Sequence, residues 1–153
     1  MRISNEHGFI RVELLDYAFN EPDYVCNLFD IRNSVEIHLG YNIDELGWGS
    51  VGSVYFLTKD IQSLSVLFSN LLFRRQNEMC YKGDWPYPMR DDRLEYFYQI
   101  TVTREQDMFT FSMRIHDLLC DYITVTEYMN IDRFEEIQKE FKDAARKFPV
   151  IEK

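Results

Sequence analysis

The stretch "SVYFLTKDIQSLSVLFSNLLFRR" (residues 53–75) changes its apolar period partway along, and this change decides the fold. Its first part, "SVYFLT" (53–58), is rich in β-branched and aromatic residues and predicts a strand. Beyond it, apolar side chains recur at helical spacing and predict a helix over 59–75 with one buried stripe. Thr58 is a suitable cap, and Asp60 lies in the first turn, where a negative charge favours the helix dipole. The stripe consists of Ile61, Leu64, Phe68, Leu71 and Leu72.

Strands are also predicted before this segment. The stretches 9–17, 24–32 and 34–41 each place apolar residues on one face, with polar residues between them. The dipeptide "NS" separates the last two stretches and predicts a tight hairpin, in which Asn33 tolerates a positive φ. The first third of the chain therefore reads as consecutive, antiparallel strands.

A loop, a second block of strands and a second helix are predicted after it. The stretch 80–92 contains Gly83, Pro86 and Pro88 and predicts a long irregular loop. The stretches 94–105, 108–116 and 122–129 predict an antiparallel meander. Asn130 is placed to cap a last helix that ends at Pro149. The apolar positions of that helix are Phe134, Ile137, Phe141, Ala144 and Phe148.

The order of these elements is four strands, a helix, three strands and a helix. Consecutive strands pair antiparallel, and one-sided helices need an apolar sheet face to cover. We therefore expect residues 1–153 to form a single α+β domain, with a two-layer, mainly antiparallel sheet covered by two helices. A chain of 153 residues with 46% hydrophobic residues is long enough to bury such a core.

The net charge of −9 is unevenly distributed. Residues 1–58 hold nine acidic and three basic residues, hence −6, and the remaining 95 residues contribute −3. A field of this sign repels nucleic acid and anionic membranes and attracts a basic partner. An acidic surface that serves only solubility would give the same composition, so both interpretations stay open.

The string "GWGSVGSV" (47–54) matches the G-x-G-x-x-G pattern of phosphate-binding loops. A dinucleotide site needs a helix at the last glycine, whereas here a strand follows, and the lysine and aspartate motifs of kinases are missing. We expect a turn-forming connection and no cofactor. His116 and Cys120 lie close together but lack the second ligand pair of a zinc site. No catalytic residue and no metal site is predicted. The three cysteines are expected to be buried thiols.

One likeness goes beyond periodicity. The segments "GFIRVELLDYAF", "LTKDIQSLSVLFSNLL" and "FKDAARKFP" occur in the order and at the spacing typical of the WapI-like family of small bacterial immunity proteins, which this chain resembles. The Trp-rich second strand and the Pro-Cys pair often seen in that family are missing here. The resemblance implies a cytoplasmic, non-enzymatic protein that binds and neutralises a cognate toxin domain.

Two functional hypotheses follow. The first is this inhibitory protein, with a basic toxin domain as partner and no nucleic acid or membrane. Its expected contact residues are acidic positions in or beside loops: Glu21, Asp23, Asp44, Glu45, Asp91 and Asp92. The second is a small-molecule-binding or enzymatic domain with a pocket between sheet and helices, lined by Tyr96, Tyr98 and Tyr122. A deep pocket would favour the second hypothesis, and a filled core would count against it.

Overall fold

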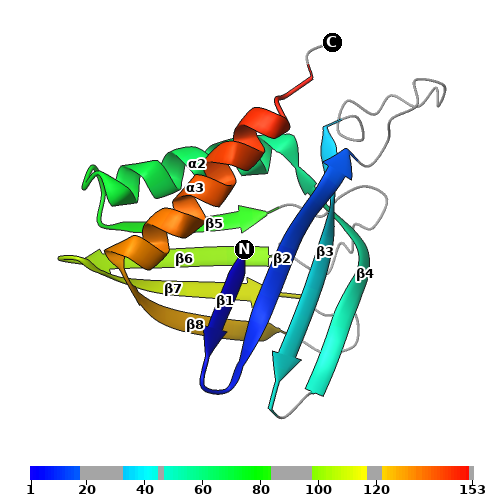
Figure 1. The fold of residues 1–153 in the computed structure, drawn as a ribbon, viewed down its shortest axis with the longest axis horizontal. Helices are drawn as coiled ribbons and strands as arrows, with labels where there is room; N and C mark the ends of the chain where they lie inside the picture. Colours follow the sequence, from blue (N-terminus) through cyan, green and yellow to red (C-terminus); the bar gives the residue numbers. More distant parts are fainter. Residues whose placement is uncertain (18–32, 45–46, 84–97, 117–121, 152–153) are drawn as a thin grey trace.

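The computed structural model describes residues 1–17, 33–44, 47–83, 98–116 and 122–151. Eight strands and two helices follow one another along these residues, and Figure 1 shows the helices together over one face of strands β5–β8. Their bounds are β1 (Arg2–Asn5), β2 (Gly8–Tyr17), β3 (Ser34–Ile43), β4 (Gly47–Leu57), α2 (Thr58–Leu72), β5 (Glu78–Gly83), β6 (Tyr98–Glu105), β7 (Met108–Ile115), β8 (Ile123–Asn130) and α3 (Ile131–Lys147).

The strands form two separate four-stranded antiparallel sheets. Sheet A has the order β1-β2-β3-β4, and sheet B has the order β5-β6-β7-β8. Strands of the two sheets cross one another in the view of Figure 1, where β1 lies beside β8. Each sheet is a simple meander because every strand pairs with its neighbour in sequence.

One apolar core joins both sheets and both helices. Phe68 of α2 is fully buried and makes edge contacts with Phe134 and Phe141 of α3, at centroid distances of 5.8 and 5.1 Å. Phe134 also stacks on Phe109 of β7 at 4.0 Å. Burial of such rings is the main stabilising contribution to a domain of this size, since each removes a large apolar area from water.

The predicted α+β class, the antiparallel pairing and the two helices are confirmed. The prediction of a single sheet is wrong. Among the described residues, the strands before α2 form one sheet and the strands after it form another. Asn130 caps α3 as predicted, and its side chain accepts a hydrogen bond from the backbone N–H of Arg133 at 3.0 Å. The predicted strand 24–32 lies outside the described residues.

Several local predictions are also corrected. Thr58 is the first residue of α2 rather than its cap, and its hydroxyl bonds to the Asn33 side chain at 3.1 Å. The two non-glycine residues with positive φ, among those described, are Arg74 and Gln106, so Asn33 is not one of them. The string 47–54 was predicted to be a turn-forming connection because of its glycines. It belongs instead to β4, where its backbone is extended and pairs with β3. The first residues of the predicted loop 80–92 belong to strand β5. Cys80, in this strand, is exposed, so the prediction of a buried thiol is wrong for it.

Neither of the two helices in the described ranges has the length and apolarity required to cross a membrane.

Candidate functional site

Sheet B has one face in the core and one face turned to solvent, which we call the sheet B outer face. The alternating burial of β6 and β7 assigns successive side chains to opposite faces. Strand register places the outward side chains in rows that run across all four strands. The central row is Cys80, Thr101, Ser112 and Thr126, and the two flanking rows are Lys82, Gln99, Arg114 and Thr124, and Glu78, Thr103, Thr110 and Tyr128.

The middle of this face is uncharged and rich in hydrogen-bonding groups. The Thr126 hydroxyl donates to the Ser112 hydroxyl at 3.0 Å. The Gln99 amide nitrogen lies 3.3 Å from the Thr101 hydroxyl and 3.2 Å from the Cys80 sulfur. A hydroxyl has one donor and two acceptor lone pairs, so these side chains retain capacity toward a ligand.

Charged side chains stand in the two flanking rows. Lys82 and Arg114 lie in the same row, on β5 and β7, while Glu78 is in the opposite flanking row. Arg114 donates to the Thr124 hydroxyl at 3.1 Å, and its guanidinium lies 5.4 Å from the Tyr122 ring centroid. These contacts fix a cation at the edge of a polar surface.

Two exposed rings border the outer face. Tyr128 of β8 is 76% exposed, and Tyr122, just before β8, is 43% exposed. The Tyr122 ring already contacts His116, at a centroid distance of 4.7 Å, and Arg114. Tyr128 is the more exposed ring, and it offers a flat surface on which a base can stack.

A hollow of about 520 Å³ adjoins Tyr128 where the β1–β2 turn meets β8. We call it the β1–β8 groove; it falls within the size range of ordinary small-ligand sites. Strand β8 contributes Thr126, Glu127 and Tyr128 to the lining. The lining residues are Ser4, Asn5, Glu6, His7, Thr126, Glu127 and Tyr128.

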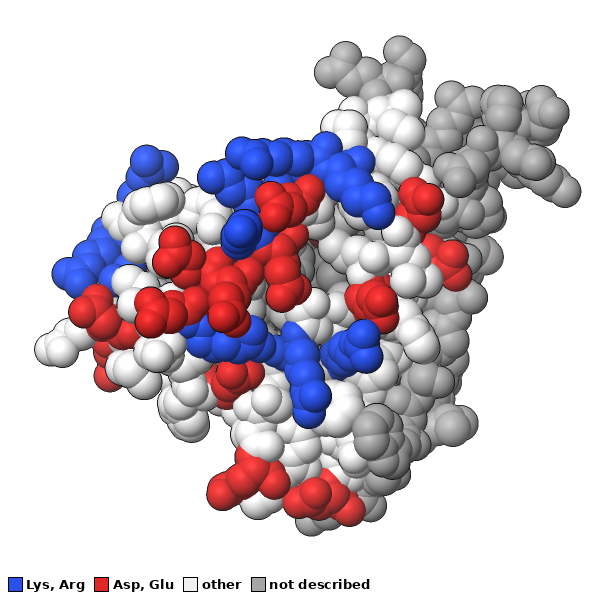
Figure 2. All heavy atoms as spheres, in the orientation of Figure 1, with Lys and Arg blue, Asp and Glu red and all other residues white. Residues whose placement is uncertain are grey.

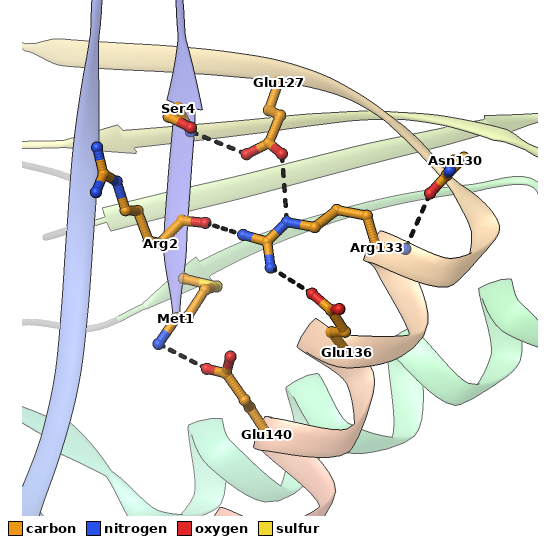
Figure 3. A network of polar contacts seen from close by, with 8 residues as sticks. All are labelled: Met1, Arg2, Ser4, Glu127, Asn130, Arg133, Glu136 and Glu140. Carbon is orange, nitrogen blue, oxygen red and sulfur yellow. Dashed lines mark hydrogen bonds and ion pairs between the residues drawn. The ribbon is translucent and has the colours of Figure 1, made fainter.

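A polar network holds the two walls of the groove together (Figure 3). The Glu127 carboxylate accepts from the backbone N–H of Ser4 at 2.9 Å and from Arg133 Nε at 3.3 Å. Arg133 also donates to the Arg2 carbonyl and pairs with Glu136 at 3.0 Å. These two carboxylates raise the pKa of the Arg133 guanidinium although its burial acts to lower it. Arg133 therefore remains charged and ties α3 to β1 and β8.

The turn itself is fixed on the other side of the groove. The Asn5 side-chain amide donates to the Thr126 carbonyl at 3.1 Å, and its oxygen accepts from the His7 backbone at 2.8 Å. The Glu6 carboxylate lies 3.3 Å from His7 Nε2 and is 84% exposed. Glu6 is thus the exposed carboxylate of the groove, whereas Glu127 is 16% exposed and engaged on both oxygens.

The helix side of the molecule has a different surface. Helix α3 carries five acidic and five basic residues. Figure 2 shows acidic side chains gathered in the middle of the face where α3 lies, with basic side chains along both sides of them.

The structure describes little of the predicted contact set. Asp44 is 70% exposed and its carboxylate lies 3.7 Å from His7 Nδ1, beside the β1–β2 turn. Glu21, Asp23, Glu45, Asp91 and Asp92 lie outside the described residues, as does Tyr96. The other two predicted pocket tyrosines, Tyr98 and Tyr122, lie in different environments. Tyr98 is buried, stacks on Phe56 at 4.5 Å and bonds to Asp60 at 3.3 Å, so it fills the core, while Tyr122 is on the surface.

Sequence reasoning missed the outer face and the groove. Alternation along β6 and β7 indicated which side chains point outward, but not that sheet B forms separately or that β5 completes it. The groove joins positions more than a hundred residues apart, such as Ser4 and Glu127, which no local pattern connects.

No protein-family model and no curated protein sequence matches this chain. Its fold is similar to that of solved structures. The plant transcriptional regulator PBF-2 matches with a TM-score of 0.54 and 11% identity, over 97% of this chain and 80% of the PBF-2 chain. WHY1 from Arabidopsis thaliana matches with a TM-score of 0.53 and 10% identity, over 97% of this chain and 88% of that chain.

These matches correct the predicted function. The chain shares its fold with a transcriptional regulator, so the predictions of a toxin inhibitor, of a toxin domain as partner and of no nucleic-acid partner are wrong. The prediction rested on the uneven acidic charge and on the likeness in layout, and net charge does not identify a partner. The resemblance in layout to the WapI-like family stays a prediction, since neither fold match bears on it.

Proposed function

We propose that this protein binds single-stranded nucleic acid on the sheet B outer face. The observation that carries the proposal is the three-row array of side chains across β5–β8, uncharged in its middle and bordered by Arg114, Lys82 and the exposed Tyr128. In a protein of net charge −9, this face is one that a polyanion can approach. The shared fold with the transcriptional regulator PBF-2 supports the same class of ligand.

The chemistry of the face suits unpaired bases better than a duplex. A four-stranded antiparallel sheet presents a broad surface on which splayed bases stack on aromatic rings and hydrogen-bond to side chains. Tyr128 supplies an exposed ring at its border, and the threonine and serine hydroxyls supply donors and acceptors. Recognition of a duplex depends instead on many phosphate contacts or on an element that enters a groove.

The few basic residues determine how binding responds to salt. Lys82 and Arg114 are the two cations in the rows of the outer face. For single strands, each neutralised phosphate contributes a slope of about −0.7 in log K against log salt, so two contacts give about −1.4. Affinity should therefore depend mainly on stacking and hydrogen bonding, and only weakly on ionic strength.

The test is fluorescence anisotropy with a labelled single-stranded oligonucleotide long enough to cross sheet B. Ser112→Glu places a carboxylate in the central row and should weaken binding about tenfold or more, because it repels phosphate and removes a hydroxyl partner. The matched control is Ser63→Glu, the same change on helix α2, on the other side of the molecule's core. It should bind as the parent does.

Two results would contradict the proposal. One is the absence of any measurable affinity for single-stranded DNA or RNA at low salt. The other is an equal loss of affinity in both serine variants, which would indicate a response to net charge rather than to a contact surface. Thermal unfolding of both variants shows that each is folded before binding is compared.

A further inference from the structure

The β1–β8 groove has a chemistry of its own that the outer face lacks. Its lining combines the exposed ring of Tyr128 with hydrogen-bond acceptors, above all the exposed Glu6 carboxylate. The Glu127 carboxylate also faces this region, but Arg133 and the Ser4 N–H already occupy its oxygens. Glu6 contacts the exposed His7 at 3.3 Å and is itself 84% exposed, so its carboxylate is the more accessible acceptor of the groove.

The walls of the groove are already fixed before a ligand enters. Asn5 is bonded both to the Thr126 carbonyl and to the His7 backbone, which holds the β1–β2 turn against β8. Arg133 holds β1 to β8 on the inner side. A site whose shape is set in advance loses less conformational entropy on binding.

The ligand that fits is flat and presents adjacent N–H donors. We propose, on the basis of the proposed function, that the groove is a guanine-selective base site, in which guanine stacks on Tyr128 and donates its N1–H and 2-amino hydrogens to the Glu6 carboxylate. Guanine presents two parallel N–H donors on that edge, which match the two oxygens of a carboxylate. Adenine and cytosine offer one amino group there, and thymine offers one ring N–H and no amino group.

The position of the groove fits this role. Tyr128 and Thr126 belong to the outward rows of β8, so a strand that crosses the sheet B outer face reaches the groove without a break. The carboxylate of Glu6 repels phosphate, which favours entry of a base edge with the backbone kept outside. An arginine side chain of another protein also offers paired N–H donors and a planar group that stacks on a ring, so it is the alternative occupant that the experiment has to distinguish.

The experiment measures the affinity of the full chain for oligothymidine strands that differ at one central position. A single guanine there should strengthen binding about fivefold or more over thymine, as expected for hydrogen bonds to a charged acceptor. Inosine, which lacks the 2-amino group, should lose most of this gain. Glu6→Gln and Tyr128→Ala should each abolish the guanine preference, while Glu135→Gln, the same change at an exposed position of α3, should keep it.

The outcomes separate the two proposals. If no strand binds, the proposed function itself is wrong. If all strands bind but guanine gives no gain, or if Glu6→Gln retains the gain, the guanine site is wrong and the outer-face proposal stands. An arginine-rich peptide that binds the groove more tightly than any of the strands would overturn the guanine site in favour of a cation site.

Discussion

The solvent-facing sides of α3 and of sheet B belong to elements that pack on each other, yet they differ in the groups that they present. Helix α3 carries five acidic and five basic residues, and some of its exposed ion pairs lie within the helix, such as Arg146 with Asp143. The sheet B outer face carries mostly hydroxyl and amide groups, with charges in its two flanking rows. A surface of balanced ion pairs is well solvated and selects no ligand strongly. Neutral polar groups at a fixed strand spacing offer an ordered set of donors and acceptors.

Under the function proposed above, α3 contributes through its inner side to stability, and sheet B contributes through its outer side to binding. Substitutions can test these two roles, because a residue that contacts its neighbours can be compared with a nearby exposed residue.

The largest effect is expected from the inner side of α3. Phe141 is 2% exposed and packs edge-on against Phe68 at 5.1 Å. Phe141→Ala should lower the free energy of unfolding by about 3–5 kcal/mol, because it removes a buried ring and leaves a cavity. Urea unfolding measures the loss. The adjacent Lys142→Ala should change stability by less than about 0.5 kcal/mol, and equal effects at both positions would refute the docking of α3.

Arg133 should have the next largest effect because it links α3 to both sheets. Arg133→Ala leaves the mostly buried Glu127 carboxylate without its cation and should cost about 1–3 kcal/mol. Arg146→Ala breaks an exposed pair within the helix and should cost less than about 0.5 kcal/mol. If thermal unfolding does not distinguish the two variants, the network of Figure 3 does not join the sheets as described.

The cap of α3 is expected to contribute less. Asn130→Ala removes the acceptor for the Arg133 backbone N–H and should destabilise the protein by about 1 kcal/mol. Asn130→Ser supplies another capping oxygen and should recover most of the loss in the same denaturation experiment. A serine variant no more stable than the alanine variant would contradict a capping role.

The smallest effect on stability is expected from the sheet B outer face. Thr103→Ala and Thr110→Ala, at paired positions on β6 and β7, should each change the free energy of unfolding by less than about 0.5 kcal/mol. The same variants should weaken binding of a single-stranded oligonucleotide about twofold to fivefold, since each removes one hydrogen-bonding group. Loss of stability without loss of binding would reverse the roles that we assign to the two regions.

The elements with local sequence signals could be predicted from the residues alone. The spacing of Phe134, Ile137 and Phe141 defined α3, and the short polar side chain of Asn130 defined its start. The alternation through Phe109 and Phe111 assigned the two faces of β7 correctly, because side chains on a strand point to opposite sides in turn.

Which strands share a sheet, and where the β1–β8 groove lies, became visible only in the folded chain. β1 and β5 are short edge strands with little period of their own, and β4 begins in glycine-rich sequence, so their extended form depends on hydrogen bonds to a neighbouring strand. The β1–β8 groove exists because β1 packs on a strand more than a hundred residues away. Strand pairing and packing between sheets are long-range interactions, and residues 4–7 carry no local signal that identifies β8 as their neighbour.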